Sequence, residues 1–307
     1  MKKIFWGLQA ALFYLLTLIA AFLPASFGYR TGTCVGRLIP LLLPKRRAIA
    51  VDNIRQALPC MVNHPLWNYH SDNPEVIARE MFINLGLSLV EICRLYHGRG
   101  EELLTKIDVC GVENYEEAKS LGKGIVFLTG HCGNWEMMAL TFNKLFGGSM
   151  SVVARRQNNP YLNRMVEVMR GRYNNSVIYK QGALKGMLTV LKRNGEIGLL
   201  ADQAVFPEEG VLIDVLGRKA WASKAPAIIA QKTGAAFLPS FIHREGERFV
   251  ITIGAAHQFG NDYSEEGIRL ETQALSHYVE KFVISHPAQW YWVHRRWKRA
   301  GELSDVS

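Results

Sequence analysis

Residues 129–136 include the side chains of this chain best suited to acid–base chemistry. Their sequence is Thr-Gly-His-Cys-Gly-Asn-Trp-Glu, and it directly follows the apolar run 125–128. A histidine can take the proton from an alcohol that attacks a carbonyl, and a carboxylate behind the imidazole can fix its tautomer and stabilise the cation. Because no serine lies between His131 and Glu136, we predict direct acyl transfer to a bound hydroxyl. His131 would be the general base, and Glu136 would orient it.

The spacing of the pair predicts where each residue lies. Positions five apart on one helix point about 140° away from each other, since successive residues rotate by about 100°. We therefore expect His131 in a strand-to-helix loop and Glu136 in the first helical turn, with Asn134 as the N-cap. The positive helix end would keep Glu136 ionised. A core histidine beside a helix-capping carboxylate is the alternative that this pair alone leaves open.

Composition limits the classes of partner and of site. The chain has 307 residues, 49% of them hydrophobic, and a formal charge of +9. Such a charge favours an anionic partner, which could be a membrane surface, a nucleic acid or a phosphorylated substrate. The five cysteines are scattered and form no C-x-x-C pair, which argues against a disulfide framework or a cysteine zinc site and favours a reducing compartment. Cys132 remains an alternative nucleophile.

The N-terminus carries a long apolar segment. Residues 4–23 include only Gln9 and Thr17 as clearly polar members, and about 20 apolar residues in a helix span a bilayer core. We predict that residues 1–28 form a transmembrane or membrane-inserted anchor, with a cleaved signal peptide or a shallow insertion as alternatives. Basic residues are more numerous after this segment than before it, which favours a body on the cytoplasmic side.

The remainder, residues 29–307, is predicted to be one domain. Residues 29–108 form a mainly helical lead-in, and residues 109–307 form an α/β core. Short apolar runs predict strands at 125–129, 150–154, 177–179, 197–200, 236–241 and 249–253. Helical spacing predicts helices at 45–58, 74–96, 134–146, 161–173, 183–193, 222–233 and 265–285. This alternation predicts an α/β fold with a mixed, mostly parallel sheet flanked by helices.

Polar side chains follow four of the predicted strands. Ligands of open α/β sheets bind beyond the carboxyl ends of the strands, so we expect these side chains to share one site. Asp202 would position a neighbouring base or arginine there. Each cluster taken singly could instead be a solvated loop or a helix cap. The clusters are His131, then Arg155-Arg156-Gln157, then Lys180, then Asp202-Gln203.

Five motifs in a fixed order cover nearly the whole chain, from the apolar start to about Arg299. They are Gly130-His131 with Asn134-Trp135-Glu136, Arg155 with Asn159-Pro160, GLLADQ at 198–203, LGRKA at 216–220 and WYWVHRRWK at 290–298. Together they resemble the bacterial lipid A late acyltransferases, the lauroyl and myristoyl transferases that finish lipid A. The H-x4-E element also occurs across glycerolipid acyltransferases. Residues 156–158 and 222–223 depart from the family pattern, which bears on the acceptor and the chain length.

The resemblance implies transfer of a fatty acyl group from acyl carrier protein or acyl-CoA. The acceptor would be the hydroxyl of a 3-hydroxyacyl chain on a phosphorylated glucosamine disaccharide. The implied location is the bacterial inner membrane, with the catalytic domain facing the cytoplasm. Because the thioester donor is already activated, neither a metal nor a cofactor is expected.

Two kinds of contact follow for the bound substrates. Arg155 or backbone amides near Gly133 would stabilise negative charge on the thioester oxygen. Cationic side chains would contact the acceptor phosphates. The candidates for phosphate contact are Arg155, Arg156, Arg170, Arg172, Lys180 and Lys185.

Other functions remain as alternatives. The same chemistry could act on a phospholipid, a mannosylated inositol lipid, an ornithine lipid or an aryl polyene. A membrane-bound hydrolase could use the dyad on water. A nucleic-acid-binding protein fits less well, because it leaves the apolar start unexplained and the aromatics are not interleaved with basic residues through the body. We therefore expect no nucleic-acid partner.

Overall fold

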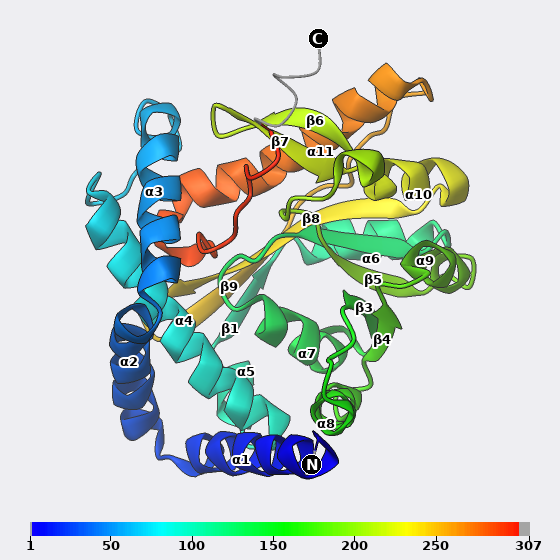
Figure 1. Cartoon of the computed structure of the whole chain (residues 1–307). Helices are drawn as coiled ribbons and strands as arrows, with labels where there is room; N and C mark the ends of the chain where they lie inside the picture. The colour runs from blue at the N-terminus through cyan, green and yellow to red at the C-terminus, as the bar shows by residue number, and fades with distance from the viewer. Residues whose placement is uncertain (1, 301–307) are drawn as a thin grey trace.

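A seven-stranded sheet with helices on both faces forms the centre of the molecule (Figure 1). The computed structural model describes residues 2–300. In space the strands follow the order β1-β9-β8-β2-β5-β3-β4, and every neighbouring pair is parallel except β8 and β9. The strands are β1 (Ile107–Cys110), β2 (Ile125–Thr129), β3 (Met150–Ala154), β4 (Ser176–Tyr179), β5 (Glu196–Leu200), β8 (Ala236–Glu245) and β9 (Arg248–Ile253).

Helices make up most of the remaining described chain, and a separate antiparallel hairpin joins β6 (Gly210–Val215) to β7 (Arg218–Ser223). The N-terminal helices are α1 (Lys2–Phe22), α2 (Ala25–Leu42), α3 (Pro44–Met61), α4 (Pro74–Tyr96) and α5 (Glu101–Leu104). The later ones are α6 (Val112–Ser120), α7 (Trp135–Phe146), α8 (Pro160–Gly171), α9 (Ala183–Leu191), α10 (Ala225–Thr233), α11 (Glu265–Ser285) and the short 3₁₀ turns η1 (Pro207–Glu209) and η2 (Pro287–Gln289).

The α/β fold with its mostly parallel sheet is confirmed, as are the positions of the six predicted strands. The sequence did not predict β1, α2, α5, α6 or the β6–β7 hairpin. The helix predicted at 222–233 begins too early, because Ala222 and Ser223 pair with the opposite strand of that hairpin. The division at residue 28 stays a prediction, and residues 1 and 301–307 of the predicted domains lie outside the described part.

Strand β2 lies at the centre of the core because both of its faces are covered. All five of its residues are buried. Phe127 packs with Met137 of α7 and Leu238 of β8 on one face, and Val126 packs with Ile197 and Phe237 on the other. Continuous apolar strands of this kind are typical of parallel sheets. The loop that follows β2 therefore starts from a rigid, fully packed element.

Helices α2 and α4 touch through glycines. A Cβ atom added to Gly86 of α4 would lie 2.2 Å from the carbonyl oxygen of Gly32 and 2.4 Å from the nitrogen of Gly36. Only glycine permits so close an approach of two helix backbones. This contact holds α4 against the N-terminal helices, and α4 in turn contributes side chains to the site described below.

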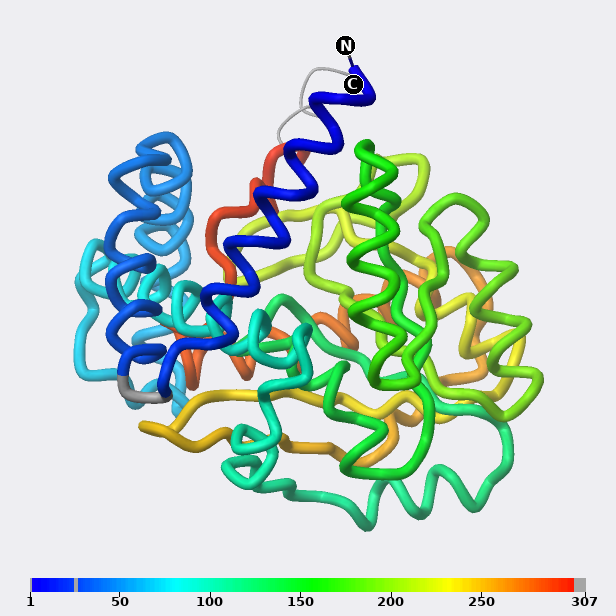
Figure 2. Tube along the Cα trace, turned by 90° about the horizontal axis from the view of Figure 1, so that it is seen from below, coloured from blue at the N-terminus to red at the C-terminus, as the bar shows by residue number. Residues whose placement is uncertain are grey.

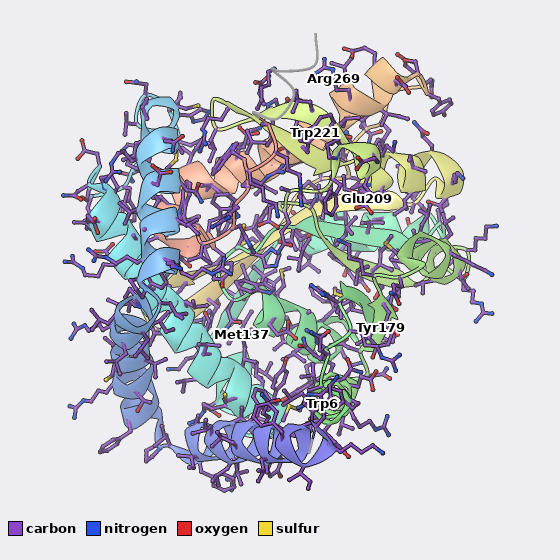
Figure 3. All side chains as sticks on the ribbon, viewed as in Figure 1. Trp6, Met137, Tyr179, Glu209, Trp221 and Arg269 are labelled. Carbon is purple, nitrogen blue, oxygen red and sulfur yellow. The ribbon has the colours of Figure 1, made fainter. Side chains whose placement is uncertain are left out.

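Helix α1 extends along the body instead of away from it. Figures 1 and 2 show it crossing beneath α4 and α8. Its Thr17 Oγ1 lies 2.9 Å from Nε2 of His97, and Asn159 donates to the carbonyl oxygen of Trp6 at 2.9 Å. Figure 3 shows Trp6 where α1 meets α8. Small residues, Ala10 and Ala21, are buried on the face that packs against the body.

Candidate active site

The register of two parallel strands brings a histidine and an aspartate together. Thr129 at the end of β2 pairs with Leu200 at the end of β5, and the amide of Ala201 donates to the Thr129 carbonyl at 2.9 Å. His131 and Asp202 each follow two residues after that pair. The carboxyl end of the sheet therefore places both side chains in one position, as the strand-end pattern predicts.

Asp202 holds His131 through two hydrogen bonds. Its Oδ1 lies 2.8 Å from the imidazole Nδ1, and its Oδ2 accepts from the backbone N–H of His131 at 2.8 Å. The carboxylate side chain is only 1% exposed. Burial alone would raise the pKa of Asp202, but the facing imidazole and these hydrogen bonds hold that pKa well below its usual range. An ionised Asp202 places the proton on Nδ1 and leaves Nε2 of His131 as the basic nitrogen.

Glu136 lies in the first turn of α7, as predicted, but its hydrogen bonds go elsewhere. Arg170 of α8 donates to its two carboxylate oxygens at 2.8 and 3.1 Å, and the Tyr96 hydroxyl donates to Oε1 at 2.9 Å. We expected Glu136 to bond His131, but Asp202 bonds the imidazole instead, because Nδ1 faces the end of β5. A catalytic role for Glu136 remains a prediction, whereas its structural role is to link α7 to α8 and α4.

The loop between β2 and α7 is fixed by backbone and side-chain contacts. Gly133 has a positive φ of 53°, and a Cβ there would lie 1.9 Å from the carbonyl oxygen of Ile242. Asn134 caps α7 by accepting from the Met137 amide at 3.1 Å, as predicted. Its own amide donates to Glu91 of α4 at 2.9 Å.

Backbone amides of this loop are already engaged. The N–H of His131 donates to Asp202, that of Cys132 to the Gly130 carbonyl, and that of Gly133 to the Gln289 carbonyl at 2.6 Å. The expectation of an oxyanion donor at the Gly133 amide therefore does not fit this arrangement. These three bonds do not account for the amides that follow residue 133, so the wider expectation of a donor near Gly133 stays a prediction.

The segment after α11 packs against Cys132 and Asp202, and the sequence did not predict this contact. Trp290 forms a single β-bridge with Cys132, and its indole N–H donates to Asp202 Oδ2 at 2.8 Å. The amide of Tyr291 donates to the His131 carbonyl at 3.0 Å. The stretch 290–298 is irregular and not a strand, and Arg296 within it is buried, with one guanidinium N–H donating to the Trp221 carbonyl.

A second histidine stands beside the first. The ring centroids of His131 and His294 are 4.8 Å apart in an edge-to-face arrangement. Gln203 Nε2 lies 3.0 Å from Nε2 of His131 and 3.3 Å from Nε2 of His294. The two residues of the predicted Asp202-Gln203 pair thus contact different nitrogens of His131. Asp202 bonds Nδ1, and Gln203 lies at Nε2.

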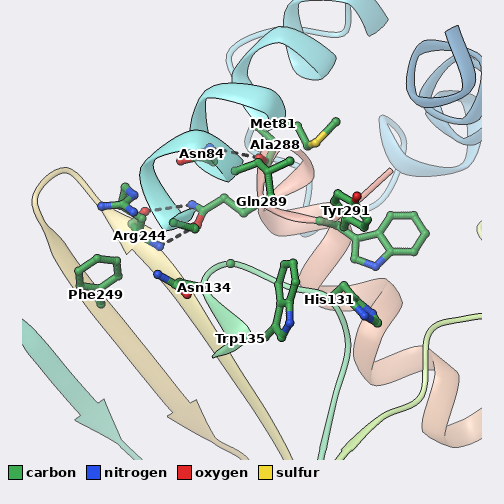
Figure 4. Close-up of a pocket in the computed structure, with 14 residues that line it drawn as sticks. Met81, Asn84, His131, Asn134, Trp135, Arg244, Phe249, Ala288, Gln289 and Tyr291 are labelled. Atoms are coloured by element: carbon green, nitrogen blue, oxygen red, sulfur yellow. Dashed lines mark hydrogen bonds between the residues drawn. The ribbon is translucent and has the colours of Figure 1, made fainter. Parts of the chain in front are cut away.

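A pocket opens next to His131 on the side of α4 and η2 (Figure 4). Its apolar walls include Trp135, Tyr291, Met81 and Phe249. Two hydrogen bonds between Gln289 and the Arg244 backbone, at 2.7 and 3.0 Å, tie η2 to β8 at one side of it. The pocket beside His131 is thus lined mainly by apolar side chains.

Other predicted cations also follow the carboxyl ends of strands, but their side chains are exposed to solvent. β3 ends at Ala154, which pairs with Tyr179 of β4, so Arg155 and Lys180 follow a shared ladder position. Arg155, Arg156 and Lys180 are all exposed, and Arg156 lies over the Tyr179 ring. Arg170 differs from them, because its guanidinium is engaged by Glu136.

Cys132 faces the core. It is fully buried, and burial followed by the nearby Asp202 carboxylate raises the pKa of its thiol well above the ordinary value. An inaccessible thiol that stays protonated has the properties of a structural cysteine and not those of a nucleophile.

Known proteins are similar to this sequence over most of its length. Residues 4–299 match the family model described as bacterial lipid A biosynthesis acyltransferase. The chain is 22% identical to a lipid A biosynthesis acyltransferase of Haemophilus influenzae, over 95% of this chain and 88% of the relative. It is 23% identical to the lipid A biosynthesis lauroyltransferase of Escherichia coli, over 91% and 88%. It is 25% identical to a phosphatidylinositol mannoside acyltransferase of Mycobacterium tuberculosis, over 71% and 67%. The chain belongs to the bacterial lipid A biosynthesis acyltransferase family.

Proposed function

We propose that this acyltransferase moves a fatty acyl group from a thioester donor to the hydroxyl of a 3-hydroxyacyl chain on a lipid A precursor. The donor is acyl carrier protein or acyl-CoA. The observation that carries the proposal is the His131–Asp202 pair, held at the carboxyl ends of β2 and β5 beside an apolar pocket. An imidazole oriented in this way is a general base for an alcohol.

The reaction follows from this arrangement. The acceptor hydroxyl gives its proton to Nε2 of His131 while its oxygen bonds to the thioester carbonyl carbon. Asp202 stabilises the resulting imidazolium from the Nδ1 side. As the carbon–sulfur bond breaks, the departing sulfur takes the proton from Nε2. The products are an ester and a thiol, and no acyl group is attached to the enzyme at any step.

Charges at the sheet edge support a phosphorylated acceptor. Three exposed cations follow the carboxyl ends of β3 and β4, and His131 and Asp202 are at the same end of the sheet. The cations are Arg155, Arg156 and Lys180. Exposed cations near the reacting centre would bind the phosphates of a glycolipid headgroup. Arg155 also remains a candidate for stabilising the negative charge that develops on the thioester oxygen in the transition state.

A second acceptor is a phosphorylated mannosylated inositol lipid. The observation that favours it is the similarity to a mycobacterial phosphatidylinositol mannoside acyltransferase at 25% identity. Both acceptors carry a phosphate and a free hydroxyl, which is on a sugar or on an acyl chain. The cations Arg155, Arg156 and Lys180 and the base His131 would therefore serve for either acceptor.

The test of the proposed function uses the purified full chain. A dodecanoyl thioester of acyl carrier protein or CoA is mixed with a detergent-dispersed glucosamine disaccharide phosphate that carries 3-hydroxyacyl chains. Mass spectrometry should show an acceptor heavier by one dodecanoyl group, and thiol release should require the acceptor. Thiol release without an acylated product would instead make the protein a hydrolase, and acylation of only an inositol mannoside would select the second acceptor.

The attachment of the enzyme to the inner membrane belongs to the same proposal. Helix α1 is long and apolar enough to cross a bilayer, yet it is bonded to the body through Trp6 and Thr17, and the Leu23 carbonyl directly after it accepts from Arg94. Its outer face exposes large apolar side chains that would enter lipid. They are Ile4, Phe5, Leu8, Leu12, Leu15, Leu16, Ile19 and Phe22. In this proposal α1 lies in the membrane plane at the cytoplasmic surface, and the catalytic domain is on the cytoplasmic side of it.

Labelling from one side of the membrane tests this orientation. In a variant without its native cysteines, single cysteines at Lys2, the first residue of α1, and at Asp214, an exposed β6 residue, should react with an impermeant maleimide from the same side. An in-plane helix keeps both ends on the side of the body, whereas a spanning helix separates them. Reaction of the Lys2→Cys protein and the Asp214→Cys protein from opposite sides would show that α1 crosses.

A further inference from the structure

The position of Gln203 marks a point that two imidazoles reach together. Its amide nitrogen lies within hydrogen-bond distance of Nε2 of His131 and close to Nε2 of His294. Because His131 uses Nδ1–H toward Asp202, its Nε2 accepts from the Gln203 amide. A hydroxyl that is to lose its proton to His131 needs the place of that amide. Gln203 therefore has to move when the acceptor binds, which leaves His294 facing the reacting atoms.

His294 is held firmly, although the segment around it has no regular secondary structure. Asn53 of α3 is buried, and its amide donates to the carbonyl oxygens of Trp292 and His294 at 2.8 and 2.7 Å. The Tyr291 ring packs edge-on against the His294 ring at 4.7 Å. Asn53 thus fixes the backbone of residue 294 and Tyr291 packs against its ring, which preorganises the imidazole beside His131.

Resting on the proposed function, we infer that His294 is a second catalytic residue, which donates a hydrogen bond from its neutral imidazole to the thioester oxygen as that oxygen becomes negative. The acceptor oxygen and the thioester oxygen are attached to the same carbon in the tetrahedral intermediate. The first lies at Nε2 of His131, so the second falls beside it, within reach of the adjacent Nε2 of His294. This assignment supplies the donor that the engaged amides of residues 131–133 do not provide.

The chemistry balances without a further reactant. The proton of the acceptor hydroxyl moves to His131, the new carbon–oxygen bond forms and the thioester oxygen gains negative charge. While the Gln203 amide faces Nε2 of His294, that nitrogen is an acceptor and the proton is on Nδ1. Once Gln203 has moved away, the Nε2–H tautomer of His294 donates to the thioester oxygen and keeps its own proton. When the carbonyl re-forms, the carbon–sulfur bond breaks and His131 returns the proton to the sulfur.

The charge state of His294 suits this role. Burial, and then the neighbouring His131, lower the pKa of His294 to about 4. At neutral pH it is therefore a neutral donor, which does not oppose the positive charge that His131 acquires during the reaction. A neutral imidazole that polarises a carbonyl oxygen is an established catalytic device.

Two substitutions at position 294 separate this role from a packing role. His294→Phe keeps an aromatic ring against Tyr291 but has no N–H, whereas His294→Gln loses the ring and keeps an N–H near the former Nε2. Loss of one oxyanion donor costs about 10²–10³-fold in kcat, so we expect that fall for Phe, with little change in KM. The Gln variant should recover at least about ten-fold over Phe, within that same range.

His286→Phe is the matched control. Burial, together with the adjacent His243, lowers the pKa of His286 to about 4 as well, and its ring stacks on the His243 ring at 4.1 Å. It is on the other side of η2 and should leave kcat within about three-fold, because it contributes no transition-state hydrogen bond. Thermal melting of all variants checks folding, and His294→Ala replaces the Phe variant in the comparison if that one fails to fold.

The outcomes distinguish the two proposals. Wild-type turnover in His294→Phe with loss in His294→Gln would make His294 a packing residue and overturn the inference. Equal loss in both variants at wild-type melting temperature would exclude the hydrogen bond in the same way. In either case an inactive His131→Ala enzyme leaves the proposed function standing, whereas an active one removes the general base on which both rest.

Discussion

Replacing His131 with alanine should slow acyl transfer by roughly 10²–10⁴-fold, the range that general acid–base catalysis usually contributes. The reason is that the acceptor hydroxyl is a poor nucleophile until Nε2 takes its proton. The measurement is the single-turnover rate with the dodecanoyl thioester donor at saturating acceptor.

Cys132→Ala is the control for that experiment. The two residues are adjacent in sequence, but the Cys132 thiol faces the core, so its removal should leave the rate almost unchanged. A silent His131→Ala change, or loss of activity in Cys132→Ala with an acyl group trapped on the wild-type enzyme, would replace the general-base mechanism with a covalent one.

Asp202→Asn should be nearly as damaging, by about 10²–10⁴-fold, because the charge and the tautomer of His131 both depend on this carboxylate. Asp202 accepts from the His131 amide, the His131 ring and the Trp290 indole. An asparagine offers one acceptor oxygen and turns an NH₂ toward one of these donors. The rate should fall while substrate binding, measured with a non-reactive thioether donor, stays close to wild type.

Glu136→Gln is the informative comparison. Its partner Arg170 is about four-fifths buried, and a buried cation left without its carboxylate costs about 3–5 kcal/mol. The main expected effect is a lower melting temperature, which the double change Glu136→Gln and Arg170→Met should partly restore. A Glu136→Gln enzyme with wild-type stability and a rate as low as that of Asp202→Asn would instead make Glu136 the partner of His131 during turnover.

Six strands of the sheet were predictable because they contain short, mainly apolar runs between helical patterns. Residues 125–129 illustrate this, since every one of them is buried. The β6–β7 hairpin was missed because it lies outside the main sheet, and Ala222-Ser223 continue without a break toward the apolar pattern of α10.

The site was predictable only as a set of strand ends. His131 and Asp202 were found because each follows a predicted strand, but their pairing depends on the Thr129–Leu200 register, which a single sequence does not reveal. The sequence favoured Glu136 instead because it is near in the chain. Trp290 and His294 lie in an irregular segment, and only the unusual aromatic and basic composition of residues 290–298 distinguished it.

The contacts of Trp290 have a consequence for the order in which the enzyme becomes functional during its synthesis. The strands that carry His131 and Asp202 leave the ribosome long before residues 289–296. Until these residues arrive, Asp202 lacks its indole donor and the Gly133 amide lacks the Gln289 carbonyl. A nascent chain therefore holds its His131–Asp202 pair without these two contacts until the last segment has folded back. We expect the pair to be fully ordered only in the completed chain.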